Sequence, residues 1–272
     1  MLKLILVLVV LLPLYLWMIA PRMTRRGQMK PFLGAMWAHR GLHCIEKGIP
    51  ENSMAAFKKA VKEGYGIELD VHLTRDGELV VFHDDTLERI CGKKGKIEEM
   101  DWEDLKKCYL SGTSEHIPLF SEVLDYIKGR VPLLIEVKLP TKDTQICARL
   151  MEELRGYQGA YLVQSFNCLV LGWLRKNRTD VLRGQLSSNL VKSDKAPHYL
   201  LRFCVTHLLS NCYSRPDFIS YKMKDSRNVS LWLSKHLFHA PVAVWTLRTG
   251  EALTEARSRY DMYIFERIHE LG

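Results

Sequence analysis

The sequence lacks the cysteine arrangements of a disulfide-bonded or zinc-binding protein. Its seven cysteines are scattered, none of them forms a Cys-x-x-Cys pair, and the odd number excludes complete pairing. Disulfide frameworks belong to oxidising compartments, so we expect reduced thiols in a cytosolic compartment. A metal site in this chain is therefore expected to use ligands other than cysteine.

The sequence also lacks a concentrated block of basic charge. Its net charge is +8, from 39 Lys and Arg against 31 Asp and Glu, but the basic residues are spread along the chain. This distribution does not predict a nucleic-acid partner. A basic surface of this kind suits contact with anionic lipid or attraction of a phosphate-bearing substrate.

Only one long hydrophobic run is present, from Leu4 to Ala20. It lies at the short end of the roughly 17–25 residues that cross a bilayer. Tyr15 and Trp17 suit a membrane interface, and four basic residues follow the run: Arg22, Arg25, Arg26 and Lys30.

We therefore predict a single-pass transmembrane anchor over residues 1–21, with the rest of the chain on the cytoplasmic side of the membrane. Residues 22–33 are predicted to be a linker and residues 34–272 a catalytic domain. The alternative is a cleaved secretory signal peptide, which the weakly charged start and the poor cleavage site disfavour.

The most informative stretch runs from Ile67 to Asp85. Glu68 and Asp70 are two residues apart in an apolar frame, so in a strand both carboxylates point to one face. After a turn, a second β-rich run ends at His83. This arrangement suits a hard divalent cation with an acid–base partner, although a solvated strand face followed by a turn is the alternative.

Strand-like and helix-like segments alternate along the rest of the chain, and the strands are of the buried type. This pattern predicts an α/β fold with parallel strands, most simply a TIM (β/α)8 barrel. There are nine strand candidates, so one is extra. The stretch 87–118, after the third predicted strand, is polar and irregular. A doubly wound open sheet is the alternative, but the sequence has no glycine-rich phosphate loop to support it.

Charged residues lie at the ends of the first four predicted strands, where barrel active sites form. They are His39 and Arg40, then Glu68 and Asp70, then His83, then Glu136 and Lys138. Three carboxylates without cysteine suit Mg²⁺ or Ca²⁺. Two histidines can share acid and base roles at a reacting phosphorus, and the two cations can bind phosphate oxygens.

Eight short pieces of the sequence, in this order, resemble the glycerophosphodiester phosphodiesterase family. They are His39-Arg-Gly41, Glu51-Asn-Ser53, Glu68-Leu-Asp-Val71, Thr74-Arg-Asp-Gly77, Val80-Val-Phe-His-Asp84, Glu136-Val-Lys138, Gln164-Ser-Phe166 and Val244-Trp-Thr246. The resemblance covers residues 35 to 266. It implies a phospholipase-C-like barrel that hydrolyses glycerophosphodiesters to glycerol 3-phosphate and an alcohol with one divalent cation, in glycerophospholipid metabolism. It also implies that the polar segment after His83 is a small insertion after the third strand, which covers the site.

The resemblance also implies roles for particular residues. The metal ligands fall on Glu68, Asp70 and Glu136, and the catalytic histidines on His39 and His83. The predicted substrate-binding residues are Arg40, Lys138, Glu51, Phe166 and Trp245. The sequence departs from the family at its end, where Tyr263-Ile-Phe-Glu266 replaces the usual Ile-Thr-Asp-type strand.

Two other functions stay open at this point. The anchor could bring the site to membrane lysophospholipids, which would then be cleaved as by a lysophospholipase D. The barrel could instead be a membrane-tethered binding protein without catalysis, but the intact histidine pair and the three acids favour an enzyme.

Overall fold

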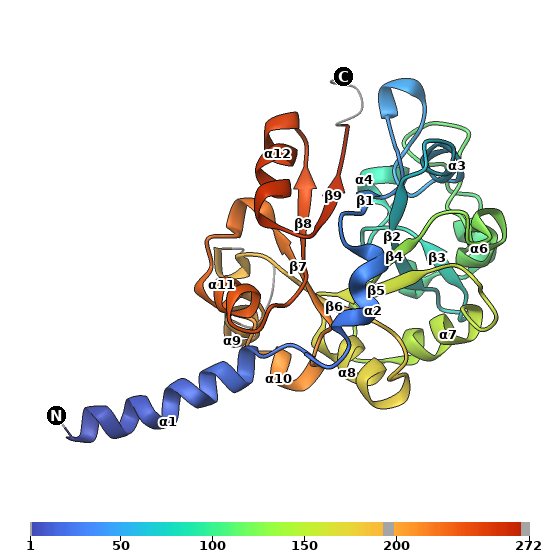
Figure 1. The fold of residues 1–272 in the computed structure, drawn as a ribbon. Helices are drawn as coiled ribbons and strands as arrows, with labels where there is room; N and C mark the ends of the chain where they lie inside the picture. The colour runs from blue at the N-terminus through green and yellow to red at the C-terminus, as the bar shows by residue number, and fades with distance from the viewer. Residues whose placement is uncertain (1, 193–198, 268–272) are drawn as a thin grey trace.

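A computed structural model describes residues 2–192 and 199–267, in which nine strands form one sheet (Figure 1). All strands but β3 pair in parallel, and the pairing of β1 with β2 closes them into a barrel, which confirms the predicted fold. The barrel strands are β1 (Met36–Ala38), β2 (Gly66–Leu73), β4 (Leu133–Val137), β5 (Tyr161–Ser165), β6 (Arg183–Ser187), β7 (Phe218–Lys222), β8 (Val242–Leu247) and β9 (Met262–Phe265).

The extra strand is β3 (Leu79–Val81), which pairs antiparallel with β2 and lies outside the barrel. The Arg75–Gly77 turn joins the two strands, and Gly77 has a φ of +85° that suits glycine. A connection this short permits a hairpin but not a parallel crossover. The predicted insertion follows, with three short helices over an apolar cluster of its own: α4 (Glu88–Cys91), η3 (Ile97–Glu99) and α5 (Trp102–Leu105).

Longer helices cover the outside of the barrel. They are α3 (Met54–Lys62), α6 (Phe120–Ile127), α7 (Gln145–Glu153), α8 (Cys168–Asn177), α9 (Tyr199–Thr206), α11 (Val229–His236) and α12 (Gly250–Arg259), with the short α10 (Asn211–Ser214) after α9. Ser53 begins α3, where its side chain accepts a hydrogen bond from the Ala56 amide. The short α5 ends at Leu105, and Tyr109 beyond it pairs with His116 in a bridge.

The barrel interior is filled at its amino-terminal end by two large rings, Trp37 and Phe218. Glycines make room for them. A Cβ at Gly66 would lie 2.8 Å from the Trp37 ring, and one at Gly184 would lie 2.2 Å from the Phe218 ring. Apolar packing at this end leaves the carboxyl ends of the strands for polar residues.

The segment 22–33, predicted as a linker, is instead packed against the amino-terminal end of the barrel. It forms α2 (Arg26–Met29) and η1 (Lys30–Phe32). Met29 and Phe32 are buried in the cluster that contains Trp37, and the Phe32 and Trp37 rings stack with centroids 6.2 Å apart. Packing against the open end of the barrel shields these apolar side chains from water. This hydrophobic contact holds the segment in place.

The first helix, α1 (Leu2–Ile19), projects from the barrel (Figure 1). Its carboxyl end is held by hydrogen bonds: the Tyr15 hydroxyl bonds Ser230 at 2.8 Å, and Asn211 donates to the Ile19 carbonyl. Across residues 2–192 and 199–267, no helix combines the length and apolar character needed to cross a membrane. The predicted transmembrane span is therefore not supported.

Candidate active site

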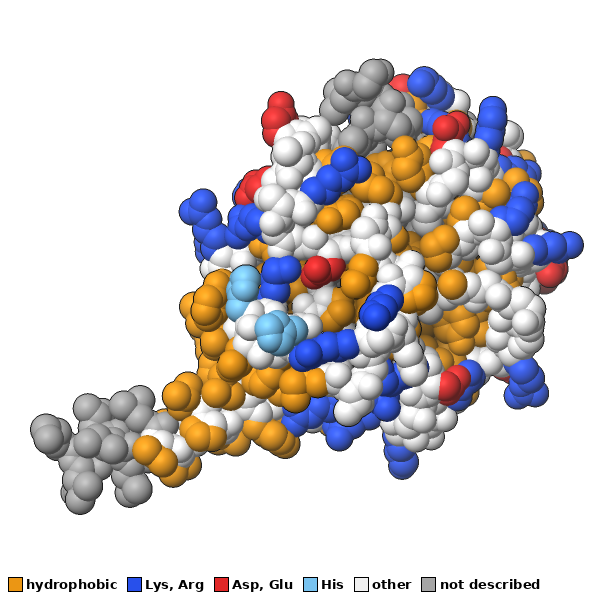
Figure 2. All heavy atoms as spheres, viewed as in Figure 1, with side chains coloured by type: hydrophobic (Ala, Val, Ile, Leu, Met, Phe, Trp, Pro, Cys, Tyr) orange, Lys and Arg blue, Asp and Glu red, His pale blue; other side chains and the backbone are white. Residues whose placement is uncertain are grey.

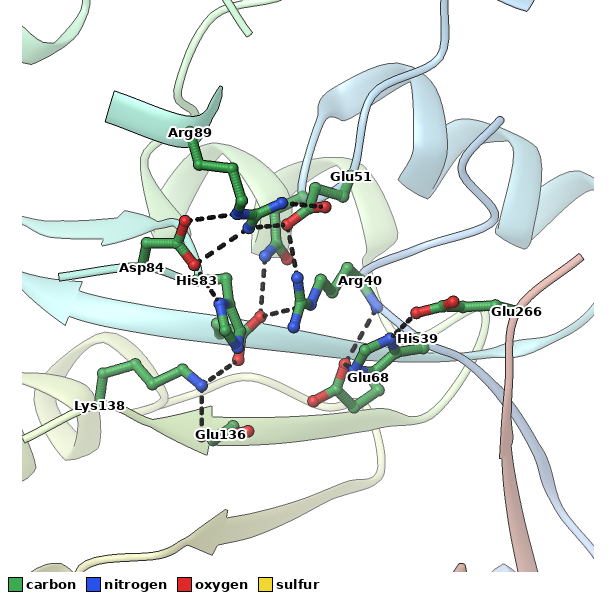
Figure 3. A network of polar contacts seen from close by, with 12 residues as sticks. His39, Arg40, Glu51, Glu68, His83, Asp84, Arg89, Glu136, Lys138 and Glu266 are labelled. Atoms are coloured by element: carbon green, nitrogen blue, oxygen red, sulfur yellow. Dashed lines mark hydrogen bonds and ion pairs between the residues drawn. The ribbon is translucent and has the colours of Figure 1, made fainter. Parts of the chain in front are cut away.

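A cleft of about 840 Å³ opens at the carboxyl ends of the barrel strands. Eight of the ten residues predicted for the site line it: His39, Arg40, Glu51, Glu68, His83, Glu136, Phe166 and Trp245. The other two contact residues that line the cleft: Asp70 lies 3.6 Å from Arg40. Lys138 bonds Glu136 (Figure 3). The structure thus places all ten of these residues in or against one cleft.

The three acids come from two adjacent strands. Asp70 on β2 is in register with Glu136 on β4, and Glu68 lies two residues before Asp70 on the same face. One carboxylate oxygen from each lies within 4.8 Å of the other two, and all three side chains are buried. Burial and the neighbouring acids raise the pKa of Glu68 well above its ordinary value, and burial raises the pKa of Glu136.

Two cations partly balance these acids. The Lys138 ammonium lies 2.9 Å from Asp70 Oδ1 and also bonds Glu136, and Arg40 Nε lies 3.6 Å from Asp70 Oδ2. Burial acting alone would raise the pKa of Asp70, but Lys138, His83 and Arg40 outweigh it and hold that pKa below its ordinary value. Asp70 therefore remains a carboxylate.

The acid cluster fits a divalent cation. Its donors are carboxylate oxygens, which hard cations prefer, and the charges are only partly matched by Lys138 and Arg40. Two buried amide oxygens beside the cluster, on Asn52 and Gln164, have no hydrogen-bond partner within the part of the chain that the structure describes. Their amide nitrogens face the acids: Asn52 donates to Asp70 at 2.9 Å and Gln164 to Glu68 at 3.5 Å.

His39 follows β1 directly and is held by a carboxylate that sequence reasoning missed. Its Nδ1 donates to Glu266 Oε1 at 2.6 Å, and its Nε2 lies 4.0 Å from Glu68 Oε2. Burial lowers the pKa of His39. Burial would raise the pKa of Glu266, but the bond from His39 and the Arg248 guanidinium lower it to about 2. The only sequence signal for Glu266 was its departure from the usual family ending.

His83 follows β3, and a carboxylate also holds its Nδ1 atom. Its Nδ1 bonds Asp84 Oδ1 at 2.6 Å, and Arg89 from α4 clamps Asp84 and Glu51 together (Figure 3). In both histidines a carboxylate holds Nδ1, which leaves Nε2 available for proton transfer. The insertion thus contributes Arg89 to the support of the site.

The remaining predicted residues form the walls. Arg40 Nη1 donates to Glu51 at 2.6 Å, so Glu51 orients the Arg40 guanidinium. Phe166 and Trp245 meet edge to face, with ring centroids 5.8 Å apart. These rings give the cleft an apolar wall beside the charged residues.

The fold and site together define a class of barrel protein, in which three buried carboxylates that fit a divalent cation share a cleft with two carboxylate-oriented histidines. The model of the Glycerophosphoryl diester phosphodiesterase family matches residues 39–267, so the chain belongs to this family.

Individual relatives support this assignment. A glycerophosphodiester phosphodiesterase of Bacillus altitudinis is 38% identical over 148 residues, which are 48% of this chain and 58% of the relative. A human lysophospholipase D is 28% identical over 155 residues, 52% of this chain and 48% of the relative. The matched part thus spans about half of these relatives.

The fold is shared with a solved Oleispira antarctica phosphodiesterase in complex with the product sn-glycerol-3-phosphate. The TM-score is 0.69 at 23% identity, over 87% of this chain and 94% of that one.

Proposed function

We propose that this protein hydrolyses glycerophosphodiesters to glycerol 3-phosphate and an alcohol, with one divalent cation, Mg²⁺ or Ca²⁺, and so acts in glycerophospholipid metabolism. The observation that carries the proposal is the placement of His39 and His83 in one cleft with the buried cluster of Glu68, Asp70 and Glu136. Family membership over residues 39–267 supports it.

The chain's own residues supply most of the chemistry. Glu68, Asp70 and Glu136 would hold the cation, which when bound polarises the phosphate and lowers the barrier to attack. Arg40 and Lys138 place positive charge beside the non-bridging oxygens. One histidine accepts a proton from the attacking hydroxyl as the new P–O bond forms. The other donates a proton to the alcohol oxygen as the old bond breaks. The attacking group is water or the substrate's own glycerol hydroxyl, which would give a cyclic phosphate first.

The proposal is tested by assaying release of glycerol 3-phosphate from glycerophosphoglycerol in Mg²⁺, in Ca²⁺ and in excess chelator. We expect turnover that chelator abolishes and that Asp70→Asn reduces together with metal affinity, measured by calorimetry. Asp125→Asn, on the exposed face of α6, is the matched control. Full activity in chelator would contradict the metal role. Binding of glycerol 3-phosphate without any turnover would instead support a silent binding barrel.

A second candidate is cleavage of membrane lysophospholipids. It is favoured by the exposed apolar side chains of α1, which Figure 2 shows projecting from the body: Val9, Val10, Leu11, Leu12, Leu14 and Trp17. We propose that this helix holds the protein at a membrane, with the barrel on the cytoplasmic side. The test compares the full chain with one that starts at Arg22. This shorter chain keeps Met29 and Phe32, which we call the plug because they fill the amino-terminal end of the barrel. Equal recovery in the membrane fraction would contradict attachment, and no cleavage of lysolipid in vesicles by either chain would contradict the lipid substrate.

A further inference from the structure

The wall of the cleft opposite the acid cluster is basic. In the closed ring of strands, β7 lies four positions from β2, which is directly across the barrel. Lys222 ends β7, and Lys224 follows in η5 (Met223–Asp225). Both side chains are exposed and line the cleft, so they place two positive charges across from the acids.

These two lysines differ from the other cations of that wall. Arg248 Nε bonds Glu266 at 2.7 Å, and Arg267 pairs with Glu46 at 3.1 Å. Lys222 and Lys224, by contrast, form no ion pair with any residue in 2–192 or 199–267. Their charge is therefore available to a ligand in the cleft.

Lys222 also determines what the aromatic wall can bind. Its ammonium lies over the Trp245 ring, 5.9 Å from the centroid. A quaternary ammonium such as choline binds best on an open aromatic face. Here that face already has a cation, so a cationic group would meet like charge, whereas an anionic group would meet two free lysines.

A glycerophosphodiester bound at the acids and histidines extends two arms from its phosphorus. The glycerol arm is uncharged, so the two lysines can form no ion pair with it. The leaving alcohol is the arm that can carry a second anionic group. A basic wall across from the phosphorus therefore matches the alcohol arm and not the glycerol arm.

We propose that Lys222 and Lys224 form a subsite for the leaving alcohol that selects alcohols carrying their own phosphate. This inference rests on the proposed function and names the substrate class within it. The preferred substrates are glycerophosphodiesters whose alcohol is itself a phosphomonoester or phosphodiester, ahead of esters of neutral or cationic alcohols.

The test uses the full chain and two esters that differ by one phosphate, glycerophosphoinositol and glycerophosphoinositol 4-phosphate, with glycerophosphocholine as the cationic ester. We expect kcat/KM to be highest for the phosphorylated ester, and to fall most steeply with added salt for that ester. In the Lys222→Gln, Lys224→Gln double variant, the ratio of kcat/KM between the phosphorylated and unphosphorylated esters should fall about 5–10-fold, mainly through KM, as expected for loss of partly exposed charge contacts.

Lys176→Gln is the matched control, since Lys176 is exposed on α8 and does not line the cleft. It should leave the ratio unchanged. A wild-type preference for the choline ester, or a ratio that the double variant does not change, would overturn the subsite while leaving the proposed function in place. Absence of turnover on all three esters would instead remove the proposed function, and the subsite with it.

Discussion

At the scale of single residues, the site depends on carboxylates that hold the histidines. Glu266 bonds Nδ1 of His39 and Asp84 bonds Nδ1 of His83, each at 2.6 Å. A carboxylate in this position fixes the ring's orientation and its tautomer, and stabilises the imidazolium that forms during proton transfer. The acid–base apparatus of this protein is therefore two pairs, not two isolated histidines.

Replacement of either histidine should remove a proton-transfer step. We expect His39→Ala and His83→Ala each to lower kcat by about 10²–10⁴, the usual contribution of a positioned acid or base. Both residues lie at strand ends outside the apolar core, so near-native circular dichroism is expected. A folded variant with wild-type kcat would show that its histidine is only structural.

Loss of the Glu266 carboxylate should act through His39. We expect Glu266→Gln to lower kcat by about 10–100-fold with little change in KM, because the amide keeps the shape but no longer stabilises a charged imidazole. The ¹H NMR signal of the His39 Nδ1 proton should shift in the same variant. Glu255→Gln, exposed on α12, is the control. Wild-type kinetics in Glu266→Gln would reduce Glu266 to a packing role.

At the scale of elements, α7 carries a buried acid with a consequence for stability. The Glu153 side chain is 9% exposed, lies 3.4 Å from Arg149, and has one carboxylate oxygen without a hydrogen-bond partner among the described residues. Burial raises its pKa to about 7 from an ordinary 4.5. As pH rises above 4.5, the unfolded chain releases this proton first, so the free energy of unfolding falls until about pH 7 and is then level.

Glu153→Gln should remove this dependence. We expect the variant to be more stable than wild type at pH 8 by about 1–3 kcal/mol and to differ little at pH 4, as measured by urea unfolding across that pH range. Glu152→Gln is the control, because the Glu152 side chain is 60% exposed on the same helix. It should leave the stability unchanged both at pH 8 and at pH 4. A wild-type profile in Glu153→Gln would mean that this acid ionises freely in the folded protein.

The elements also show what sequence alone could predict. The alternation of strand-like and helix-like segments predicted the barrel, because that signal is local. The end of α5 and the packing of residues 22–33 depend on partners far along the chain, Tyr109 with His116 in one case and Met29 with Trp37 in the other. Such tertiary contacts override local preference, and one sequence does not reveal them.

At the scale of the whole molecule, the segment 22–33 belongs to the barrel. Met29→Ala or Phe32→Ala should lower the free energy of unfolding by about 2–5 kcal/mol, the usual cost of removing a buried side chain of this size. Chemical unfolding of each variant measures this. Leu33→Ala is the control, since Leu33 is 45% exposed beside them. Wild-type stability in both plug variants would mean that the segment only rests on the barrel.

The same scale separates what could be predicted of the site from what could not. Strand-end charges and the resemblance located all ten predicted residues in or against one cleft. Glu266, Arg89, Lys222 and Lys224 were missed. Their relevance depends on which strands face one another in the closed ring, and this is a property of the completed fold rather than of any local pattern.

The hydrogen bond between His39 and Glu266 also determines when, during synthesis of the chain, His39 can be oriented. The two residues are 227 positions apart in the chain, and β1 is flanked in the barrel by β9. During translation, the segment from Glu68 to Glu136, which carries the three acids, is synthesised long before Glu266, the partner of His39. A nascent chain could therefore bring Glu68, Asp70 and Glu136 together early, but Glu266 can orient His39 only after β9 has been added. Under the proposed function, catalytic competence would be a late event of synthesis.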